Sequence, residues 1–128
     1  MAVMQIRVVS SVAVVDKKMT EREADVLVLA SPVYWSGFTS QIKTAIDRFY
    51  QFSFPKGRET LHIKDLYLIA ASANPDSAMF NDVVHAYEQL CELLDKGGTL
   101  LCPGLAGADD LENHQEFLEK AVKMGMAI

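Results

Sequence analysis

The chain has 128 residues, of which 50% are hydrophobic and 23% are charged; this composition is typical of a soluble globular protein and predicts a single domain over residues 1–128. The formal net charge of −5 argues against a surface for nucleic acid or an anionic membrane, because either partner requires clustered Lys and Arg side chains. Two cysteines and three scattered histidines supply neither a disulfide framework nor a metal site, and no apolar run approaches the ~18 residues of a transmembrane helix. We therefore expect a cytoplasmic protein without nucleic-acid or membrane partners.

The start of the chain has the pattern of an exposed strand. From Met4 to Val8, apolar residues alternate with polar ones, which predicts a half-exposed strand, and residues 12–15 either extend it or form a second short strand. A signal peptide is not indicated, because Arg7 and two serines interrupt the apolar residues and no cleavage site follows. Residues 20–24 leave room for no more than a helical turn.

Three uninterrupted apolar runs follow and predict buried strands. They are Val26–Ala30, Leu66–Ala71 and Thr99–Cys102. Because polar residues do not alternate within them, both faces of each strand should be covered, as in a parallel sheet. Helical periodicity fills the intervals between the runs, so the order of elements predicts an open α/β sheet with right-handed crossovers.

The first expected helix follows the first apolar run. Apolar residues between Phe38 and Phe49 share one helical face, and either Ser36 or Thr39 is available as the N-cap. The segment Pro55–His62 comes next and is expected to be the longest polar loop.

The second and third expected helices follow the other two runs. The second begins near Asp76 or Ser77, and the Gly97-Gly98 pair is expected to end it. The third begins at about Asn113 and is expected to end at Gly125.

The loop after the first apolar run has the composition of a ligand site. In open α/β sheets, ligands bind outside the carboxyl ends of the strands, and Ser31–Gly37 lies at such an end. Pro32 fixes the direction of the chain, Gly37 permits a close backbone approach, and Tyr34 and Trp35 offer flat surfaces with a polar edge. A planar heteroaromatic ligand would suit this loop, with backbone N–H groups as donors to its edge. Alternatively, the two aromatic side chains cap the core or form a subunit contact.

The stretch SPVYWSGFTSQIKTAIDRF resembles the flavin-loop segment of the flavodoxin-like NAD(P)H-dependent FMN reductases and related multimeric flavodoxins. The positions that match in order and spacing are Ser31, Pro32, Tyr34, Ser40, Lys43, Asp47 and Arg48. The resemblance extends from about Val14 to the end of the chain.

That resemblance implies a flavodoxin-like open parallel sheet with helices on both faces and an FMN-dependent NAD(P)H oxidoreductase. The residues that it places at the cofactor are Pro32, Val33, Tyr34, Trp35, Ser36 and Gly37, with Ala73 and Asn74 as a second wall. NAD(P)H would be the co-substrate and a small molecule or a second flavin the electron acceptor, so neither a catalytic side chain nor a metal ion is required. Because the family commonly forms dimers or tetramers, the resemblance also implies a homo-oligomer.

The chain departs from that family at its start. Family members begin with a strand, a phosphate loop, a helix and a second strand, whereas only 15 residues precede Asp16. FMN binding is then expected to be weak or absent, because the phosphate loop supplies the donors to the phosphate; Ser10-Ser11 is the alternative within the chain. Three hypotheses stay open: a phosphate site completed by another copy, binding through the ring alone, or a non-catalytic assembly module.

Other residues with reactive or charged side chains are assigned structural roles. Lys43 and Asp47 are spaced as a helical ion pair. Cys91 falls on the apolar face of the second helix as an inert thiol, and Cys102 has no basic residue nearby in sequence to activate it. The acidic residues at 109–112 are expected to form a solvated loop before the last helix, where they complement its dipole.

Overall fold

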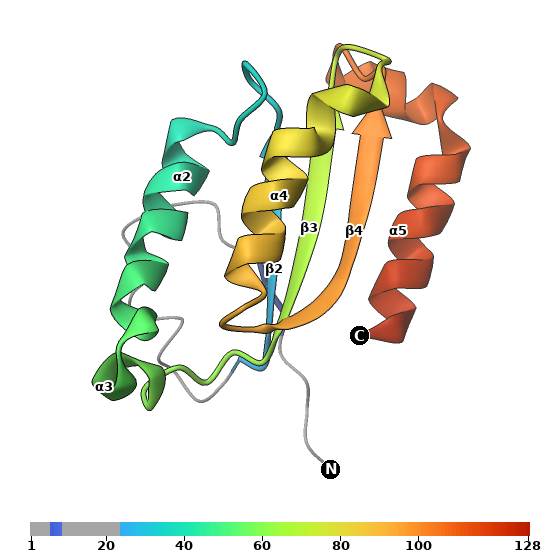
Figure 1. Ribbon diagram of the computed structural model, residues 1–128. Coiled ribbons are helices and arrows are strands. Elements are labelled where there is room, and N and C mark those ends of the chain that lie inside the picture. Colours follow the sequence, from blue (N-terminus) through green and yellow to red (C-terminus); the bar gives the residue numbers. More distant parts are fainter. Residues whose placement is uncertain (1–5, 9–23) are drawn as a thin grey trace.

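A computed structural model describes residues 6–8 and 24–128 (Figure 1). In this part of the chain, four strands form one sheet in the order β1-β2-β3-β4, and every neighbouring pair is parallel. The predicted open parallel α/β sheet is therefore confirmed. The expectations for residues 4–5, 12–15 and 20–23, and for Ser10-Ser11, lie outside the described residues.

The three apolar runs lie within three neighbouring strands, β2 (Val26–Pro32), β3 (Asp65–Ser72) and β4 (Asp95–Pro103). A short strand, β1 (Ile6–Val8), pairs with β2. In β3, alternate residues from Leu66 to Ser72 are buried, and those between them are half-buried. The two faces of the sheet are thus covered unequally, whereas the apolar runs predicted full cover on both.

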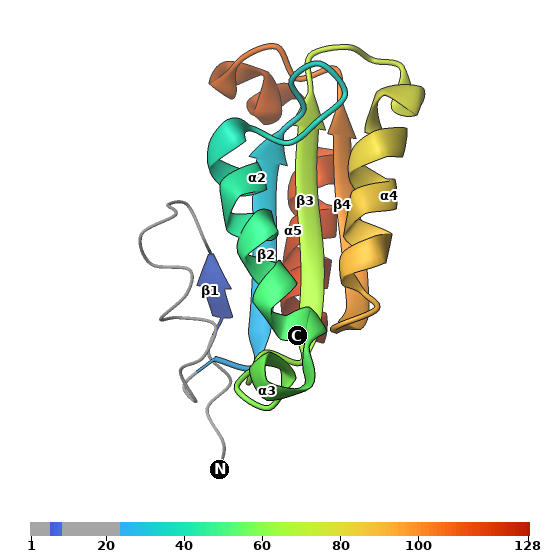
Figure 2. The same ribbon diagram turned by 60° about the vertical axis from the view of Figure 1, so that its left-hand side comes forward.

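Helices cover both faces of the sheet (Figure 2). On one face lie α2 (Ser40–Asp47) and α4 (Asn81–Leu90), and on the other lies α5 (Gln115–Ala127). Each strand lies beside the previous one, on the same side, in the order β2, β3, β4. Right-handed crossovers therefore place α2 and α4 on the same face. The larger core lies beneath these two helices, and a smaller one joins Phe117 of α5 to the sheet.

The predicted first helix is confirmed but shorter than expected. Thr39 is its N-cap, since its Oγ1 accepts a hydrogen bond from the Ile42 backbone N–H at 3.3 Å. A 3-10 helix, η2 (Arg48–Ser53), continues from α2. The expected polar loop that follows contains a short helix, α3 (Pro55–Arg58), because proline at the first helical position is preorganised for the turn.

The expectation that Gly97-Gly98 ends the second helix is wrong. That helix region consists of a 3-10 turn, η3 (Ser77–Phe80), and α4, which ends at Leu90. Both glycines lie within β4, where the register with β3 shifts between Leu66 and Tyr67. Gly97 is needed there because a Cβ at this position would lie 2.3 Å from Cε2 of Tyr67.

The last helix also differs from its prediction. A 3-10 helix, η4 (Ala108–Asn113), precedes α5, so the acidic residues belong to a helical turn and not to a loop. Gly125 lies inside α5 and does not end it. Among the described glycines only Gly104 has a positive φ, of 77°, so Gly125 keeps the right-handed conformation of the helix. Within the described residues, no helix is long and apolar enough to cross a lipid bilayer.

Candidate functional site at the carboxyl edge of the sheet

The loop after β2 ends in a tight two-residue turn. Tyr34 and Gly37 exchange backbone hydrogen bonds of 3.0 Å in both directions. Between them, Trp35 and Ser36 have φ angles of 51° and 65°. These values lie in the left-handed region, which residues other than glycine seldom adopt. Trp35 is fully exposed and Tyr34 is 63% exposed, so the alternative that these aromatics cap the core is not what the structure shows.

Buried contacts hold the base of this loop. Ser31 is buried, and its Oγ accepts a hydrogen bond from the Thr39 backbone N–H at 3.2 Å and donates one to the Pro32 carbonyl at 2.8 Å. The Val33 N–H donates to the Ala71 carbonyl at 2.7 Å, which continues the β2–β3 pairing past the end of the strand. A rigid base therefore carries an exposed aromatic tip.

The loop after β3 is connected to the loop after β4. Ser72 accepts from the Asn74 N–H through its Oγ at 3.2 Å and from the Leu105 N–H through its carbonyl at 2.8 Å. The Gly104 N–H donates to the Asn74 carbonyl at 3.2 Å, and the positive φ of Gly104 permits this turn. The two loops consequently form one hydrogen-bonded wall.

Asp110 organises the third loop of the site. Its Oδ2 accepts hydrogen bonds from the Ala106 N–H at 2.8 Å and the Gly107 N–H at 3.0 Å. The sequence analysis missed this role, because it assigned the acidic residues only to the dipole of the last helix. The signal that was available is an acidic residue shortly after a glycine-containing strand exit, a common way to satisfy turn amides.

Together the three loops enclose a cavity of about 540 Å³ outside the carboxyl ends of β2, β3 and β4. The residues that line it are Pro32, Val33, Tyr34, Ala71, Ala73, Leu105, Ala106, Gly107 and Leu111. The volume lies within the range of about 300–1,000 Å³ that is usual for ligand pockets. Its position is where open α/β sheets bind their ligands.

The structure brings together half of the residues expected at the cofactor. Pro32, Val33, Tyr34 and Ala73 line the cavity. The other four, Trp35, Ser36, Gly37 and Asn74, do not line it and instead form the exposed turn and the connection between loops. The loop at 105–107 and Leu111 were missed, although they follow a third apolar run whose carboxyl end meets the same edge of the sheet.

The chemistry of the lining suits a flat ring better than a phosphate. Most of the lining is apolar, and no Lys, Arg or His side chain belongs to it. In the part of the chain that the structure describes, the N–H groups of Trp35 and Ser36 have no acceptor; they lie outside the cavity, in the turn that follows Tyr34. An isoalloxazine ring therefore fits this site, whereas the described residues provide no cation for the phosphate of FMN.

The two thiols lie outside the cavity and are not activated. Burial raises the pKa of Cys102, which packs between β4 and α5, and burial also raises the pKa of the half-buried Cys91. Higher pKa values favour the neutral thiol, which is a poor nucleophile. The expected structural roles of both cysteines agree with this. The predicted Lys43–Asp47 ion pair is also present, on the exposed face of α2.

An open parallel α/β sheet with a ligand-sized cavity outside the carboxyl ends of its strands is the arrangement of the doubly wound α/β proteins, which include the flavodoxin-like class. A family model described as flavodoxin-like fold matches residues 11–122. The chain belongs to this family.

Relatives connect the family to redox chemistry. The chain is 25% identical over 99 residues to the putative NAD(P)H-dependent FMN-containing oxidoreductase YwqN of Bacillus subtilis (strain 168), covering 73% of this chain and 55% of that protein. The chain therefore spans little more than half of the length of this curated relative.

Two solved structures share the fold. The Trp repressor binding protein from Bacillus subtilis matches with a TM-score of 0.64 at 22% identity, over 82% of this chain and 64% of that one. An NAD(P)H:quinone oxidoreductase from Methanothermobacter marburgensis matches with a TM-score of 0.56 at 13% identity, over 87% of this chain and 63% of that one.

Proposed function

We propose that the chain is an NAD(P)H-dependent flavin oxidoreductase that binds FMN mainly through its ring. The observation that carries the proposal is the apolar cavity of about 540 Å³ at the carboxyl edge of the sheet. The curated relative is described as FMN-containing and NAD(P)H-dependent, and the cavity is where this chain would hold the same cofactor.

The residues of the cavity have distinct tasks in this proposal. Tyr34 and Pro32 form one flat wall, and the small side chains of Ala71 and Ala73 leave space beside them. The N–H groups of Trp35 and Ser36 would be available as donors to a part of the flavin that extends past Tyr34 beyond the cavity. When bound, the flavin accepts hydride from the nicotinamide and passes electrons to a small molecule or a second flavin; the chain orients the ring and supplies no acid or base.

A titration with two flavins tests the proposal. FMN and riboflavin are added to the protein, and the fluorescence of Trp35, its single tryptophan, is followed together with that of the flavin. Since no cation lines the cavity, we expect mutual quenching and dissociation constants that agree within about threefold. Much tighter FMN binding would contradict the ring-only mode and indicate a phosphate site outside the described residues. Absence of quenching with either flavin would overturn the proposed function.

A cavity-filling substitution gives the matched control. Ala73→Leu places a larger side chain inside the cavity, whereas Ala78→Leu changes an exposed alanine outside it. We expect the first variant to bind riboflavin at least about tenfold more weakly and to lose flavin-dependent NAD(P)H oxidation in proportion. The second should behave as the unmodified chain does. Equal binding by both variants would place the flavin elsewhere.

The competing function is an assembly module that uses the exposed aromatic turn to bind a partner chain. It is favoured by the full exposure of Trp35 and by the positive φ angles that hold the turn outward. Trp35→Ala separates the two functions. In the flavoenzyme it leaves the molecular mass in solution unchanged, whereas in the assembly module it lowers the mass.

We also propose that the chain forms a homo-oligomer through α5. Leu118, Val122 and Met126 form an apolar row on this helix and are 38%, 62% and 84% exposed. Glu119 and Lys123 flank the row, and within the described part of the chain neither has an ion-pair partner. A second copy packed antiparallel about Val122 would bring each Glu119 opposite Lys123 of the other copy. The surface is therefore self-complementary in charge.

A further inference from the structure

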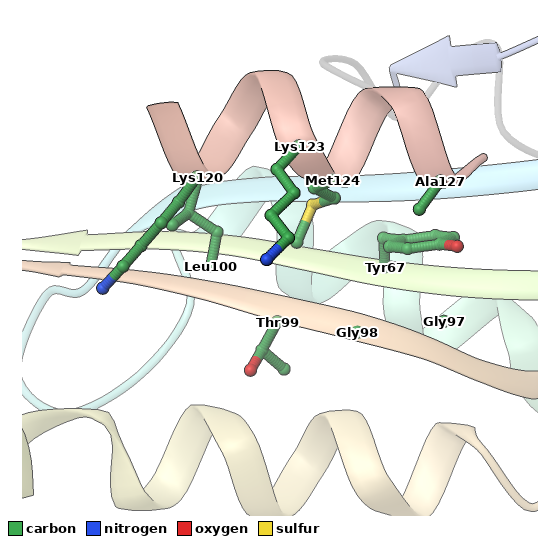
Figure 3. A pocket seen from close by; sticks show the side chains of 9 residues that line it. All are labelled: Tyr67, Gly97, Gly98, Thr99, Leu100, Lys120, Lys123, Met124 and Ala127. Atoms are coloured by element: carbon green, nitrogen blue, oxygen red, sulfur yellow. The ribbon is translucent and has the colours of Figure 1, made fainter. Parts of the chain in front are cut away.

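A second cavity lies away from the flavin site, between α5 and the open edge of β4 (Figure 3). It has a volume of about 330 Å³. Its lining residues are Tyr67, Gly97, Gly98, Thr99, Leu100, Lys120, Lys123, Met124 and Ala127. None of them lines the cavity at the carboxyl edge, so whatever binds here does so independently of the proposed flavin site.

An aromatic ring and bare backbone form one side of this cavity. The ring of Tyr67 lies against Gly97, so closely that a Cβ on this glycine would be 2.3 Å from Cε2 of the ring. Leu100, Met124 and Ala127 add apolar surface from β4 and α5. Thioether and aromatic groups adapt well to a flat apolar occupant.

Two ammonium groups provide the polar side. Lys120 and Lys123 are one helical turn apart, and Figure 3 shows both side chains projecting from α5 toward the edge of β4. In the described residues neither has an ion-pair partner, and no carboxylate lines the cavity. The chain as a whole has 17 acidic and 12 basic residues, so a cavity with two lysines and no acid is locally opposite in charge to the molecule.

One acidic residue near Lys120 is already engaged. Glu116 lies 3.0 Å from His114, measured from Oε1 to Nδ1. The hydrogen bond from His114 lowers the pKa of Glu116, and the charge of Lys120 adds a smaller lowering. The charge of Lys120 thus affects the pKa of Glu116 although the two side chains form no ion pair. In a single copy, an anion that enters the cavity would meet both ammonium groups without a carboxylate partner. In the α5 pair proposed above, Glu119 of the other copy would compete with the anion for Lys123, and Lys120 would stay available.

We propose that this cavity binds a small aromatic carboxylate, with its ring against the Tyr67 wall and its carboxylate between Lys120 and Lys123. The apolar walls account for the ring and the paired cations for the acid. A free phosphate would make no favourable apolar contact with Tyr67 and Met124, and a neutral ring would leave both lysines without an anionic partner. The volume corresponds to one or two fused rings, since it falls at the lower end of ligand pockets.

The test uses 2-naphthoate as the probe and its neutral isostere 2-naphthamide as the control. Both are titrated into the ¹⁵N-labelled protein, and amide shifts are followed by NMR. We expect saturable shifts with naphthoate at Gly97, Gly98 and residues 120–127, and at least about tenfold weaker binding of the amide. Equal affinity for the two probes, or shifts that fall elsewhere, would overturn the proposal. Riboflavin should shift a separate set around 32–37 and 105–107, so failure of the flavin site is recognised independently.

A charge-removal variant completes the test. The double substitution Lys120→Gln and Lys123→Gln removes both charges, keeps two of the four methylenes of each stem and should reduce naphthoate affinity to that of naphthamide. Lys56→Gln, on the exposed surface of α3, is the matched control and should change nothing. Lysines beside an edge strand also discourage pairing with other strands. If that is their only role, the double variant will aggregate without any change in naphthoate affinity, and the ligand site is refuted.

Discussion

Tyr87 joins α4 to the irregular point of the sheet. Its side chain is completely buried, and its hydroxyl donates to the Leu66 carbonyl at 2.7 Å and accepts from the Gly98 N–H at 3.2 Å. These are the backbone groups next to the shift in register between β3 and β4. The phenol thus satisfies polar atoms that the shift leaves without strand partners.

Removing this hydroxyl should destabilise the fold. Tyr87→Phe leaves two buried backbone groups unsatisfied, and we expect the free energy of unfolding to fall by about 1–3 kcal/mol in urea denaturation. Tyr50→Phe, at an exposed tyrosine, is the control and should change it by less than about 0.5 kcal/mol. A similar stability for both variants would mean that water replaces the hydroxyl.

The same residue predicts a loss of stability in alkali. Burial raises the pKa of Tyr87 from 10.0 to about 12, so the folded state favours the neutral phenol. Below pH 10 the stability that comes from the buried neutral phenol is fully present. It is lost as the pH rises toward the folded-state pKa, because in this range the phenol ionises in the unfolded chain but not in the folded one. We expect a fall of up to about 2–3 kcal/mol between pH 10 and 12, measured by urea denaturation, and a flatter profile for Tyr87→Phe.

Two glycines should respond oppositely to alanine. Gly97→Ala drives a Cβ into the Tyr67 ring and should cost about 1–3 kcal/mol, whereas Gly125→Ala, in open space within α5, should stabilise by about 0.5–1 kcal/mol. Thermal unfolding measures both. Adding Tyr67→Ala to Gly97→Ala should recover part of the loss; additive effects would show that the ring is not the obstacle.

At the scale of elements, the turn at residues 34–37 has an unfavourable backbone conformation that lowers the stability of the fold and holds an aromatic side chain at its tip. Its central residues, Trp35 and Ser36, have positive φ angles, for which an Asn-Gly pair is far better suited. We expect the double substitution Trp35→Asn and Ser36→Gly to raise the free energy of unfolding by up to about 1 kcal/mol and to weaken riboflavin binding. If the double variant is more stable but binds riboflavin with unchanged affinity, the turn does not contribute to the flavin site.

The elements with a single physical cause were predictable from the sequence. The apolar runs predicted β2, β3 and β4, and the loop after β2 was found from its aromatic and proline residues. The N-cap was narrowed to Ser36 or Thr39, and the structure assigns it to Thr39. Gly97-Gly98 was misassigned because glycine both ends helices and tolerates close packing, and only the partner, Tyr67, decides between them. The wall at 105–107 was missed because Asp110, whose carboxylate accepts from its turn amides, was assigned to the dipole of the last helix, and because its contact with the loop after β3 leaves no local pattern.

At the scale of the whole molecule, charge reversal on α5 tests the proposed assembly. Glu119→Lys would place like charges opposite each other in the antiparallel pair and should lower the molecular mass measured by light scattering. Adding Lys123→Glu restores opposite charges and should restore the mass, with dissociation constants that differ by about tenfold or more between single and double variants. A single species of unchanged mass in all three proteins would refute assembly through this surface.

The spatial order of the strands is the same as their order along the chain. During synthesis, each strand from β2 to β4 can therefore pair with the one completed just before it, without waiting for a distant segment. Once Ser72 has been made, β2, α2 and β3 are all available to pair and pack, and the free edge of β3 is then the template for β4. The order in which the ribosome synthesises the strands is thus the order in which they can join the sheet.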